Sequence, residues 1–370
     1  MSSNLNSHRK HNFSAGPCTL PLSVLEQAQQ EFVDYQGTGM SLIEMSHRGK
    51  HFDAVANEAM ALSMEIFQVP DDFSVLFLQG GAMLQFSMVP MNLLSNGQKG
   101  AYVNSGAWAD GAITDAKEYG DIYTAWDGAE NNYTRMPATA ELEMQDNTRY
   151  LHITTNETIG GIRFPEWPQV DVPLIGDMSS EYMARPLPWG KFDLVYGGAQ
   201  KNLGPAGMTV VFIRKSILAN TNKNIGRYLR YDIHESNKSM FNTPPVFPIY
   251  MFGKVLKWMK KQGGLAAMET LAAEKSAILY HAIDDSDGYY HCPVDVACRS
   301  QMNIVFRLPS EQLEQKFLSE SAQANFINLK GHRSVGGCRA SIYNALPKSS
   351  VDALAEFMAT FRNDNARDNG

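Results

Sequence analysis

The residue of this sequence best suited to covalent chemistry is a lysine in a glycine-rich turn. Lys201 lies in the segment YGGAQKNLGPAG (196–207), just after a short apolar stretch that is typical of a buried strand. Glycines let the backbone turn tightly and approach a ligand closely. A lysine held at the end of such a strand can lose its water, which lowers its pKa and makes its amine nucleophilic toward an aldehyde. A solvated loop lysine is the alternative that this segment alone leaves open.

A carboxylate ends the predicted strand that precedes this lysine. Asp177 is the last residue of VPLIGD (172–177). Neighbouring strands of a parallel sheet would deliver Asp177 and Lys201 to one edge, because such sheets bind ligands beyond the carboxyl ends of their strands. Pyridoxal phosphate (PLP) needs this pair: a lysine for its aldehyde and a carboxylate that keeps its ring nitrogen protonated. An aspartate that caps a turn or a helix start is the ordinary alternative.

Two further side chains could complete a site for a flat ring. Trp108 follows Gly106 after a predicted strand, and stacking of its indole would be worth about 0.5–1.5 kcal/mol beyond area burial. Thr158 adds a hydroxyl after the strand at 149–154. A tryptophan in the hydrophobic core explains Trp108 equally well when that residue is viewed alone.

A Gly-Gly turn offers a place for phosphate. The segment Gly80-Gly81-Ala82-Met83 lies between a predicted strand and a predicted helix. Free backbone N–H groups and the helix dipole favour an anion at such a junction. Taken alone, a Gly-Gly turn is a weak signal.

Two basic segments could bind the anionic groups of a substrate. Both SHRGK (46–50) and GHRSVGGCRAS (331–341) pair histidine with arginine beside glycines. Arginine binds carboxylate or phosphate in a bidentate fork, and a substrate with two anionic ends needs two such clamps. A solvated surface explains either segment alone. The candidate residues are His47, Arg48, His332, Arg333 and Arg339.

Strands alternate with helices through the first two thirds of the chain. This alternation predicts an α/β fold with a mostly parallel sheet that is covered on both faces. Predicted helices cover 21–35, 52–67, 82–94 and 108–119. Predicted strands cover 73–78, 101–104, 149–154, 172–177, 193–198 and 208–213.

The pattern changes after about residue 265. Helices at 265–284, 310–321 and 348–362 then alternate with strands at 302–308 and 338–344, as in a smaller α+β unit. We therefore expect a large domain over residues 15–265 and a small C-terminal domain over residues 266–370. The N-terminal segment 1–14 is expected to join the small domain.

Composition narrows the classes of function. A net charge of −7 gives no general attraction to nucleic acid or anionic membranes, and no apolar run reaches the roughly 20 residues of a membrane helix. The first ten residues lack the apolar stretch of a secretory signal, so a cytoplasmic location is expected. No metal site is expected, because the four cysteines fit no zinc pattern. They are Cys18, Cys292, Cys298 and Cys338.

Seven motifs of this chain are also found together in one enzyme family. They are NFSAGP (12–17), SHRGK (46–50), NETIGG (156–161), GAQKNLGPAG (198–207), MFNTPP (240–245), KGHRSVGG (330–337) and RASIYNA (339–345). With them the chain resembles the phosphoserine aminotransferases, which are class V aminotransferases with the fold of type I PLP transferases. The resemblance extends from about residue 12 to residue 361.

The resemblance implies a homodimer with active sites at the subunit interface and PLP as cofactor. Lys201 would carry PLP as a Schiff base, Asp177 would pair with the ring nitrogen, and Trp108 would stack on the ring. Asn242 and Thr243 would reach the cofactor phosphate from the other subunit. The remaining cofactor-binding residues would be Ala82, Met83, Thr158 and Gln200. The substrate-binding residues would be Arg48 and Arg339 for carboxylates, and His47, His332 and Arg333 near the substrate phosphate or side chain.

The activity implied is a ping-pong transfer of the amino group of L-glutamate to 3-phosphohydroxypyruvate. Its products are O-phospho-L-serine and 2-oxoglutarate, for serine biosynthesis. Enzymes of this family in bacteria also act on the 4-phosphohydroxythreonine pair in pyridoxine biosynthesis, which we expect here as a second activity. Some members carry Gly-Arg where this chain has Ala82-Met83, so substrate phosphate is expected to depend more on Arg48, His332 and Arg333.

Two other functions stay open at this point. A cysteine desulfurase shares the fold and the cofactor but needs a reactive cysteine, and Cys292, Cys298 and Cys338 have no evident activating context. A nucleotide-binding α/β module without catalysis belongs to a different class. The sequence carries neither G-x-G-x-x-G between a strand and a helix nor G-x-x-x-x-G-K-[ST], which such modules use for phosphate.

Overall fold

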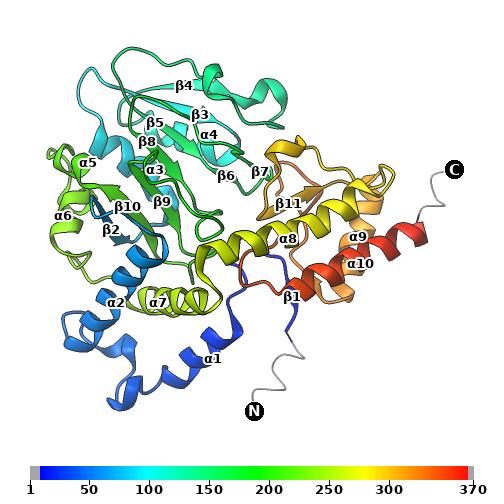
Figure 1. Cartoon of the computed structure of the whole chain (residues 1–370), viewed down its shortest axis with the longest axis horizontal. Helices are drawn as coiled ribbons and strands as arrows, with labels where there is room; N and C mark the ends of the chain where they lie inside the picture. The colour runs from blue at the N-terminus through cyan, green and yellow to red at the C-terminus, as the bar shows by residue number, and fades with distance from the viewer. Residues whose placement is uncertain (1–8, 366–370) are drawn as a thin grey trace.

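A central sheet organises the larger part of the chain, whose computed structural model describes residues 9–365. Within that range, seven strands form the sheet (Figure 1). Their order is β2 (Phe73–Leu78), β10 (Thr209–Arg214), β9 (Leu194–Gly198), β8 (Leu174–Asp177), β5 (Thr148–Thr154), β3 (Lys99–Asn104) and β4 (Asp121–Asp127). Strand β10 is antiparallel to both of its neighbours, and the other neighbouring pairs are parallel. The mostly parallel sheet predicted from the alternation is therefore confirmed.

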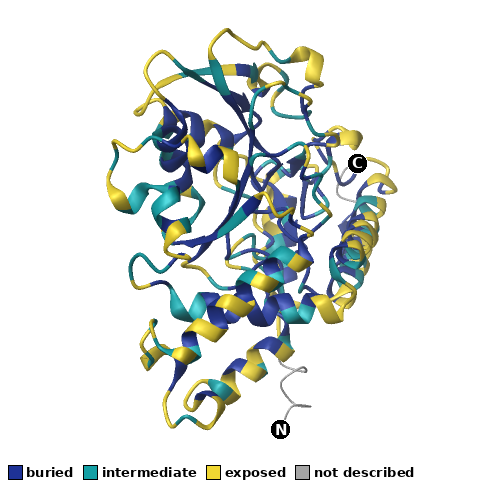
Figure 2. Cartoon of the chain, turned by 60° about the vertical axis from the view of Figure 1, so that its left-hand side comes forward, coloured by how far each residue is buried: buried dark blue, intermediate teal, exposed yellow. Residues whose placement is uncertain are grey.

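Helices cover both faces of the sheet, and its central strands are accordingly apolar along most of their length. One face packs against α3 (Gly81–Leu93), α4 (Ala107–Ala116), α5 (Lys215–Ala219) and α6 (Tyr231–Ser236). The other face packs against α2 (Lys50–Ile66) and α7 (Val246–Lys261). Figure 2 shows the strands as a buried layer between these helices. The strands, and with them their carboxyl ends, are thus held in place by helices on both faces of the sheet.

The N-terminal helix lies at the outside of this arrangement. Helix α1 (Leu22–Glu31) packs on α7, and α7 in turn packs along α2 (Figure 1). The segment between α1 and α2 contains the short helices η3 (Tyr35–Gly37) and η4 (Leu42–Glu44). Further short elements are β6 (Asn156–Glu157), β7 (Ile162–Arg163), η5 (Gly128–Asn131), η6 (Thr139–Glu141), η7 (Arg227–Leu229) and η8 (Val296–Cys298).

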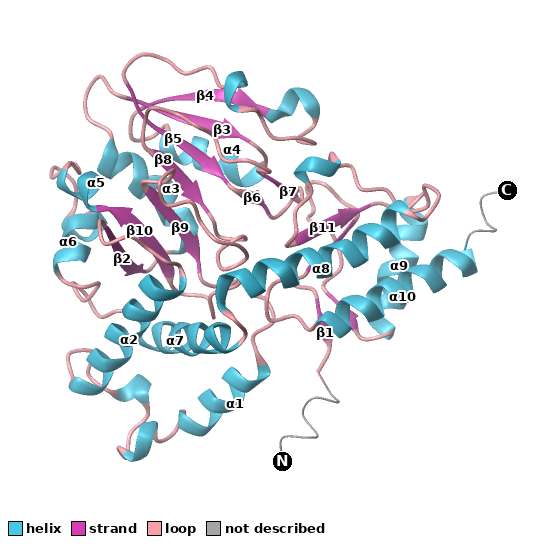
Figure 3. Ribbon diagram, viewed as in Figure 1, coloured by secondary structure: helices cyan, strands magenta, loops and turns pink. Residues whose placement is uncertain are grey.

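The C-terminal third packs beside the sheet, on the right-hand side of Figure 3. It begins with the long helix α8 (Gly264–Asp284). Strand β11 (Asn303–Phe306) pairs antiparallel with β13 (Cys338–Ser341). Near the start of the chain, β1 (His11–Asn12) pairs with β12 (Phe326–Ile327), so an N-terminal segment adds to the C-terminal part. The remaining helices are α9 (Glu311–Gln323) and α10 (Lys348–Asn365), which packs along α8.

Several elements were not predicted from the sequence, among them the helices α5, α6 and α7 and the strand β4. The apolar residues of α7 recur with the helical period as clearly as those of α1, so this helix carried a signal that the sequence analysis overlooked. Strand β4 forms an edge of the sheet, and its residues are largely exposed or half-buried. It therefore lacks the contrast between a buried and a solvated face on which the prediction of a strand depends. Among residues 9–365, no helix combines the length and the apolar character that crossing a membrane requires.

Candidate active site

Two neighbouring strands bring a carboxylate and a lysine to one edge of the sheet. Strand β8 ends at Asp177, which is opposite Tyr196 of the parallel strand β9, and Lys201 follows the end of β9. Both side chains line a cavity of about 230 Å3. The cavity is lined by Gly80, Gly81, Ala82, Met83, Trp108, Thr154, Asn156, Thr158, Asp177, Ser179, Ser180, Gln200 and Lys201. Seven residues named from the sequence thus meet: Ala82, Met83, Trp108, Thr158, Asp177, Gln200 and Lys201.

The amine of Lys201 is buried at this cavity. The residue is 7% exposed, and its Nζ donates a hydrogen bond to Thr158 Oγ1 at 2.6 Å. Burial lowers the pKa of Lys201 to about 8, against the opposing effect of the Asp177 and Glu157 carboxylates. A considerable fraction of the amine is therefore neutral near physiological pH, as a nucleophile toward an aldehyde has to be.

The carboxyl group of Asp177 is held firmly and is 4% exposed. Its Oδ1 accepts hydrogen bonds from the backbone N–H of Ser179 at 2.9 Å and from Ser179 Oγ at 2.7 Å. Burial raises the pKa of Asp177, while these hydrogen bonds and Lys201 act in the opposite direction. A buried carboxylate of this kind gains from a cationic partner in the cavity.

An aromatic wall faces the lysine. The Nζ of Lys201 lies 5.7 Å from the centroid of the Trp108 ring. Within the part of the chain that the structure describes, the buried atoms Trp108 Nε1 and Thr154 Oγ1 have no hydrogen-bond partner. Buried polar atoms of folded proteins are normally paired, so these two atoms indicate that the cavity takes a polar ligand.

The start of helix α3 forms another wall. Gly80 and Gly81 have φ angles of 90° and 67°, which favour glycine, and a Cβ at Gly80 would lie 2.5 Å from the Leu84 side chain. No side chain caps the first turn of this helix, and Ala82 and Met83 lie beside the cavity. The free N–H groups of this turn favour an anionic group.

Arg339 approaches the cavity from the C-terminal part of the chain. It belongs to β13, and its guanidinium donates a hydrogen bond to the backbone oxygen of Thr158 at 3.2 Å. Burial lowers the pKa of Arg339, and its buried Nε has no partner among the described residues. The arginine is therefore close to Lys201 and retains a free donor.

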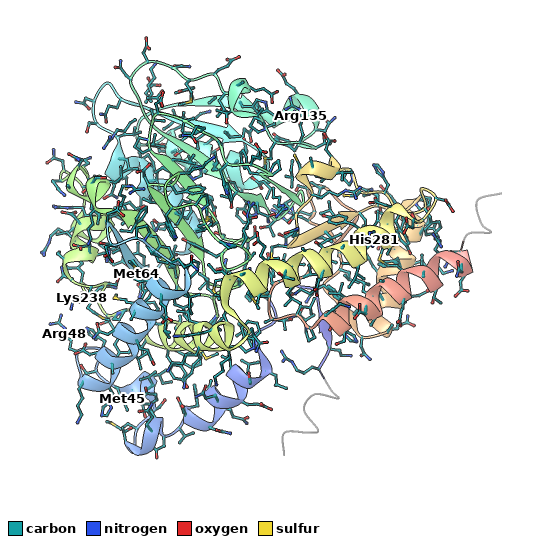
Figure 4. The ribbon with its side chains drawn as sticks, viewed as in Figure 1. Met45, Arg48, Met64, Arg135, Lys238 and His281 are labelled. Atoms are coloured by element: carbon teal, nitrogen blue, oxygen red, sulfur yellow. The ribbon has the colours of Figure 1, made fainter. Side chains whose placement is uncertain are left out.

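Seven residues named from the sequence do not line this cavity, and Arg339, described above, is one of them. His332 and Arg333 line a separate cavity of about 330 Å3. Arg48 is exposed at the left-hand edge of the molecule in Figure 4, where its Nε lies 3.4 Å from His47 Nε2. Asn242 and Thr243 do not line the cavity; the amide of Gln79, the residue before Gly80, donates to the backbone oxygen of Thr243 at 3.2 Å. The seven are His47, Arg48, Asn242, Thr243, His332, Arg333 and Arg339.

The sequence analysis missed Thr154, Asn156, Ser179 and Ser180 of the cavity wall, and Glu157 beside it. Glu157 is fully buried, and it accepts hydrogen bonds from the backbone N–H groups of Trp108 and Ala109. It belongs to the NETIGG motif that also contains Thr158. The signal that could have identified it is an acidic residue directly after a buried strand, where a carboxylate is costly unless it has partners.

The cysteines are poor candidates for nucleophiles. Cys292, Cys298 and Cys338 are free and buried. Burial raises the pKa of Cys292 and Cys338, whereas a reactive thiol needs a lowered pKa and access to solvent. Residues 9–365 also contain no group of three or more His, Cys, Asp or Glu side chains that could hold a metal ion.

Comparison with known proteins gives a consistent result. The family model for class V aminotransferases matches residues 10–354. A phosphoserine aminotransferase of Niallia circulans is 52% identical over 357 residues, which is 96% of this chain and 99% of that protein. The phosphoserine aminotransferase of Bacillus subtilis is 44% identical and covers 96% of this chain and 99% of its own length.

Solved structures agree with these sequence matches. The phosphoserine aminotransferase of Bacillus circulans subsp. alkalophilus superposes with a TM-score of 0.95 at 51% identity, covering 96% of this chain and 99% of that chain. A PLP-bound phosphoserine aminotransferase of Trichomonas vaginalis has a TM-score of 0.91 at 38% identity, with coverages of 95% and 100%.

Proposed function

The chain belongs to the class V aminotransferases and, within them, to the phosphoserine aminotransferases, and we propose that it transfers the amino group of L-glutamate to 3-phosphohydroxypyruvate. The products are O-phospho-L-serine and 2-oxoglutarate, and the pathway is serine biosynthesis. A single observation carries the proposal. A buried lysine and a buried carboxylate from adjacent parallel strands face one cavity beside a tryptophan ring.

The residues of this cavity fit PLP, which is the cofactor of the family. Lys201 would hold its aldehyde, and Asp177 would pair with its protonated ring nitrogen. Trp108 would stack on the ring, and the uncapped first turn of α3 would bind the phosphate. The unpaired buried atoms Trp108 Nε1 and Thr154 Oγ1 are consistent with a polar ligand in this space.

Bound PLP supplies an aldehyde that takes up amino groups and a ring that accepts the electron pair of a broken C–H bond. The chain supplies the rest. Lys201 Nζ would act as the general base that takes the proton from the substrate α-carbon and as the general acid that gives the proton back. Its lowered pKa of about 8 suits both directions of this transfer. Thr158 Oγ1, which accepts a hydrogen bond from Nζ, orients the amine.

Arg339 would bind the α-carboxylate of the substrate. Its free Nε and its contact with the backbone of Thr158 put a guanidinium beside the amine. A charge-assisted hydrogen bond of this kind contributes about 1.5–3 kcal/mol. The substrate would thus be held with its α-carbon near Lys201.

A second copy of the chain would complete the site. Arg48 is exposed and His47 is half-buried, neither residue lines the cavity within one chain, and Asn242 and Thr243 do not line it either. In a homodimer with active sites at the interface, these side chains would come from the partner. Arg48 would then hold a substrate carboxylate, and Asn242 and Thr243 would reach the phosphate of PLP.

The phosphate of the substrate would depend on the histidine and arginine pairs. His47, His332 and Arg333 would lie near it. Met83 is 61% exposed and cannot form a charged contact in the place where some family members have arginine. The same groups would accept the 4-phosphohydroxythreonine pair of pyridoxine biosynthesis, since it also carries a phosphate and a carboxylate.

Two features of organisation belong to this proposal. The chain would divide into a large domain over 15–265 and a small domain over 266–370 with segment 1–14, of which residues 1–8 and 366–370 lie outside the described part. The pairing of β1 with β12 and the start of α8 at Gly264 support this division. The location would be cytoplasmic, which suits four free cysteines.

The test is a spectrum of the purified protein followed by the reaction. The protein with PLP should absorb in the near-visible range and lose this band on addition of L-glutamate. Addition of 3-phosphohydroxypyruvate should then restore the band and release O-phospho-L-serine. A protein that stays colourless with added PLP, or that releases sulfide from cysteine instead, would reject the proposal.

A further inference from the structure

A second buried carboxylate beside the cavity has no part in the chemistry described above. Glu157 is 0% exposed and ends the short strand β6, directly before Thr158. A buried carboxylate is costly unless hydrogen bonds compensate for the lost water. Its partners therefore indicate what it does.

Those partners belong to a different segment, the turn at 105–109. Glu157 Oε1 accepts from the backbone N–H of Ala109 at 2.8 Å, and Oε2 accepts from that of Trp108 at 3.1 Å. Ser105 Oγ donates to Oε1 at 3.4 Å. Helix α4 begins in this turn, and its own N-cap residue Gly106 has no side chain to cap it. Glu157 caps the helix from another part of the chain.

The turn leaves no room for any residue but glycine next to this carboxylate. Gly106 has a φ angle of 154°, and a Cβ there would lie 2.9 Å from Cδ of Glu157. Real Cβ atoms do not come so close to a carboxyl carbon that is itself held by two hydrogen bonds. The backbone of the turn is thus built directly against the carboxylate.

The residue that follows Glu157 in the chain, Thr158, holds the amine of Lys201. Thr158 accepts the hydrogen bond of Lys201 Nζ, while Glu157 holds the backbone of Trp108. The ring of Trp108 in turn faces that amine. The dipeptide 157–158 therefore links the two opposite walls of the cavity.

We propose that Glu157 is a positioning residue, whose ionised carboxylate fixes the 105–109 turn and so holds the indole of Trp108 in place for the cofactor ring. This inference rests on the proposed function, because it takes Trp108 as the stacking residue. It differs from that function in what it predicts for the protein without cofactor, where the hydrogen bonds to the turn already exist.

Two titratable groups around Glu157 influence its charge, Asp177 at the end of β8 and Lys201 after β9. Tyr133, which follows η5, is itself affected, since Glu157 raises the pKa of that phenol. Burial raises the pKa of Glu157 to about 7, and Asp177 acts in the same direction, while the two N–H donors and Lys201 oppose it. The ionised form that accepts both hydrogen bonds therefore predominates above about pH 7.

This carboxylate costs the fold stability in its ionised form. A carboxyl group whose pKa is higher in the folded than in the unfolded protein loses stability as pH rises from its ordinary range to the folded value. The substitution Glu157→Gln removes the charge and replaces one acceptor oxygen by an amide N–H, which cannot accept a hydrogen bond, so it should abolish the dependence of the melting temperature on pH near pH 7. A residue retained at a cost to stability is expected at functional sites.

The experiment compares the wild type with Glu157→Gln from pH 6 to pH 8.5. Hydrogen exchange of the Trp108 and Ala109 amides is measured without PLP and expressed as a protection factor, and PLP dissociation constants are measured beside it. In the wild type, protection and PLP affinity should each rise by about tenfold through pH 7, since a tenfold change corresponds to one charge-assisted contact. In Glu157→Gln, neither the protection factor nor the PLP affinity should change with a midpoint near pH 7.

Two further variants keep the result interpretable. Ser310→Ala removes the cap of α9, where Ser310 Oγ accepts from the Leu313 N–H, and should lower the melting temperature without altering either pH profile. Glu157→Asp keeps the charge on a shorter side chain and should retain a pH dependence with weaker protection. It provides the test if Glu157→Gln does not fold.

The outcomes separate this inference from the proposed function. If the wild type fails to bind PLP at any pH, the proposed function is wrong. If the wild type binds PLP but shares its two pH profiles with Glu157→Gln, the positioning role of Glu157 is wrong and the proposed function stands. If both profiles of the wild type have a midpoint near pH 7 and those of Glu157→Gln do not, the positioning role of Glu157 and the proposed function are both supported.

Discussion

The two ends of the active site are built in different ways. At the cofactor end, Lys201, Asp177 and Trp108 are fixed by buried strands and a helix start, and all of them come from one chain. At the proposed substrate end, Arg48 and Arg333 lie in loops, and neither lines the cavity. A sheet edge defines positions within a single chain, because both faces of the sheet are packed. Under the proposed function, the surface loops would acquire their positions in the site from a partner chain.

The electrostatics of the cofactor end follow from the same difference. Lys201 and Asp177 lie where water is scarce, so burial moves the pKa of each toward the neutral form. A ligand that supplies the partner each side chain lacks would therefore stabilise both of them. The comparison predicts that variants at the cofactor end affect the chemical step, whereas variants at the substrate end affect binding.

The largest effect is expected at the lysine. Lys201→Ala should reduce turnover by at least about a thousandfold, because it removes the group that moves the proton. Steady-state kinetics with L-glutamate and 3-phosphohydroxypyruvate provide the measurement. Lys257→Ala, which removes a surface lysine paired with Glu58, is the matched control and should retain wild-type turnover. Wild-type turnover by Lys201→Ala would mean that another group does this work.

The next largest effect is expected at the carboxylate. Asp177→Asn should lower kcat by about a hundredfold, since a buried opposite charge shifts the pKa of its partner by about 1–3 units and an amide does not. The melting temperature of the protein without PLP should not fall, because burial already disfavours the charge of Asp177. A variant with normal kcat would remove Asp177 from the account.

A smaller effect, on binding, is expected at the substrate end. Arg48→Ala should raise KM by about tenfold or more and leave kcat nearly unchanged, because it removes a charge-assisted contact worth about 1.5–3 kcal/mol. Unchanged KM values for both substrates would reject the role of Arg48.

Mixing variants tests whether Arg48 acts in the partner's site. Dimers that combine Lys201→Ala in one chain with Arg48→Ala in the other have one site with neither defect. Such mixtures should show more activity at low substrate concentration than the sum of the separate variants. If the activity of the mixture equals the sum of the activities of the separate variants, Arg48 and Lys201 act in the site of the same chain. The difference drawn here between the cofactor end and the substrate end would then be wrong.

The smallest effect concerns pH. PLP uptake by the cofactor-free protein should become about tenfold faster between pH 7 and pH 9, because only the neutral amine reacts and the pKa of Lys201 is about 8. Stopped-flow absorbance measures this rate. A rate that rises only above pH 10 would indicate an ordinary solvated lysine.

The sequence predicted most of what depends on neighbouring strands. The apolar runs before Asp177 and Lys201 identified two strands, and the parallel arrangement of an α/β sheet was sufficient to bring their ends together. The Gly80-Gly81 turn likewise followed from composition, since φ angles of 90° and 67° favour glycine.

Contacts between distant segments could not be predicted in this way. The capping of α4 by Glu157 joins two segments about fifty residues apart, and nothing in either segment alone specifies the other. The contact of Arg339 with Thr158 depends on how the C-terminal part packs against the sheet. Such contacts arise from tertiary packing, which hydrophobic periodicity does not encode.

The central claim is that Lys201 holds the cofactor covalently, and one measurement tests it directly. The purified protein is incubated with PLP, reduced with borohydride, digested and analysed by mass spectrometry. The account predicts a phosphopyridoxyl group on the peptide that contains Lys201 and on no other lysine in stoichiometric amount. A stoichiometric label on a different lysine, or none at all, would contradict it.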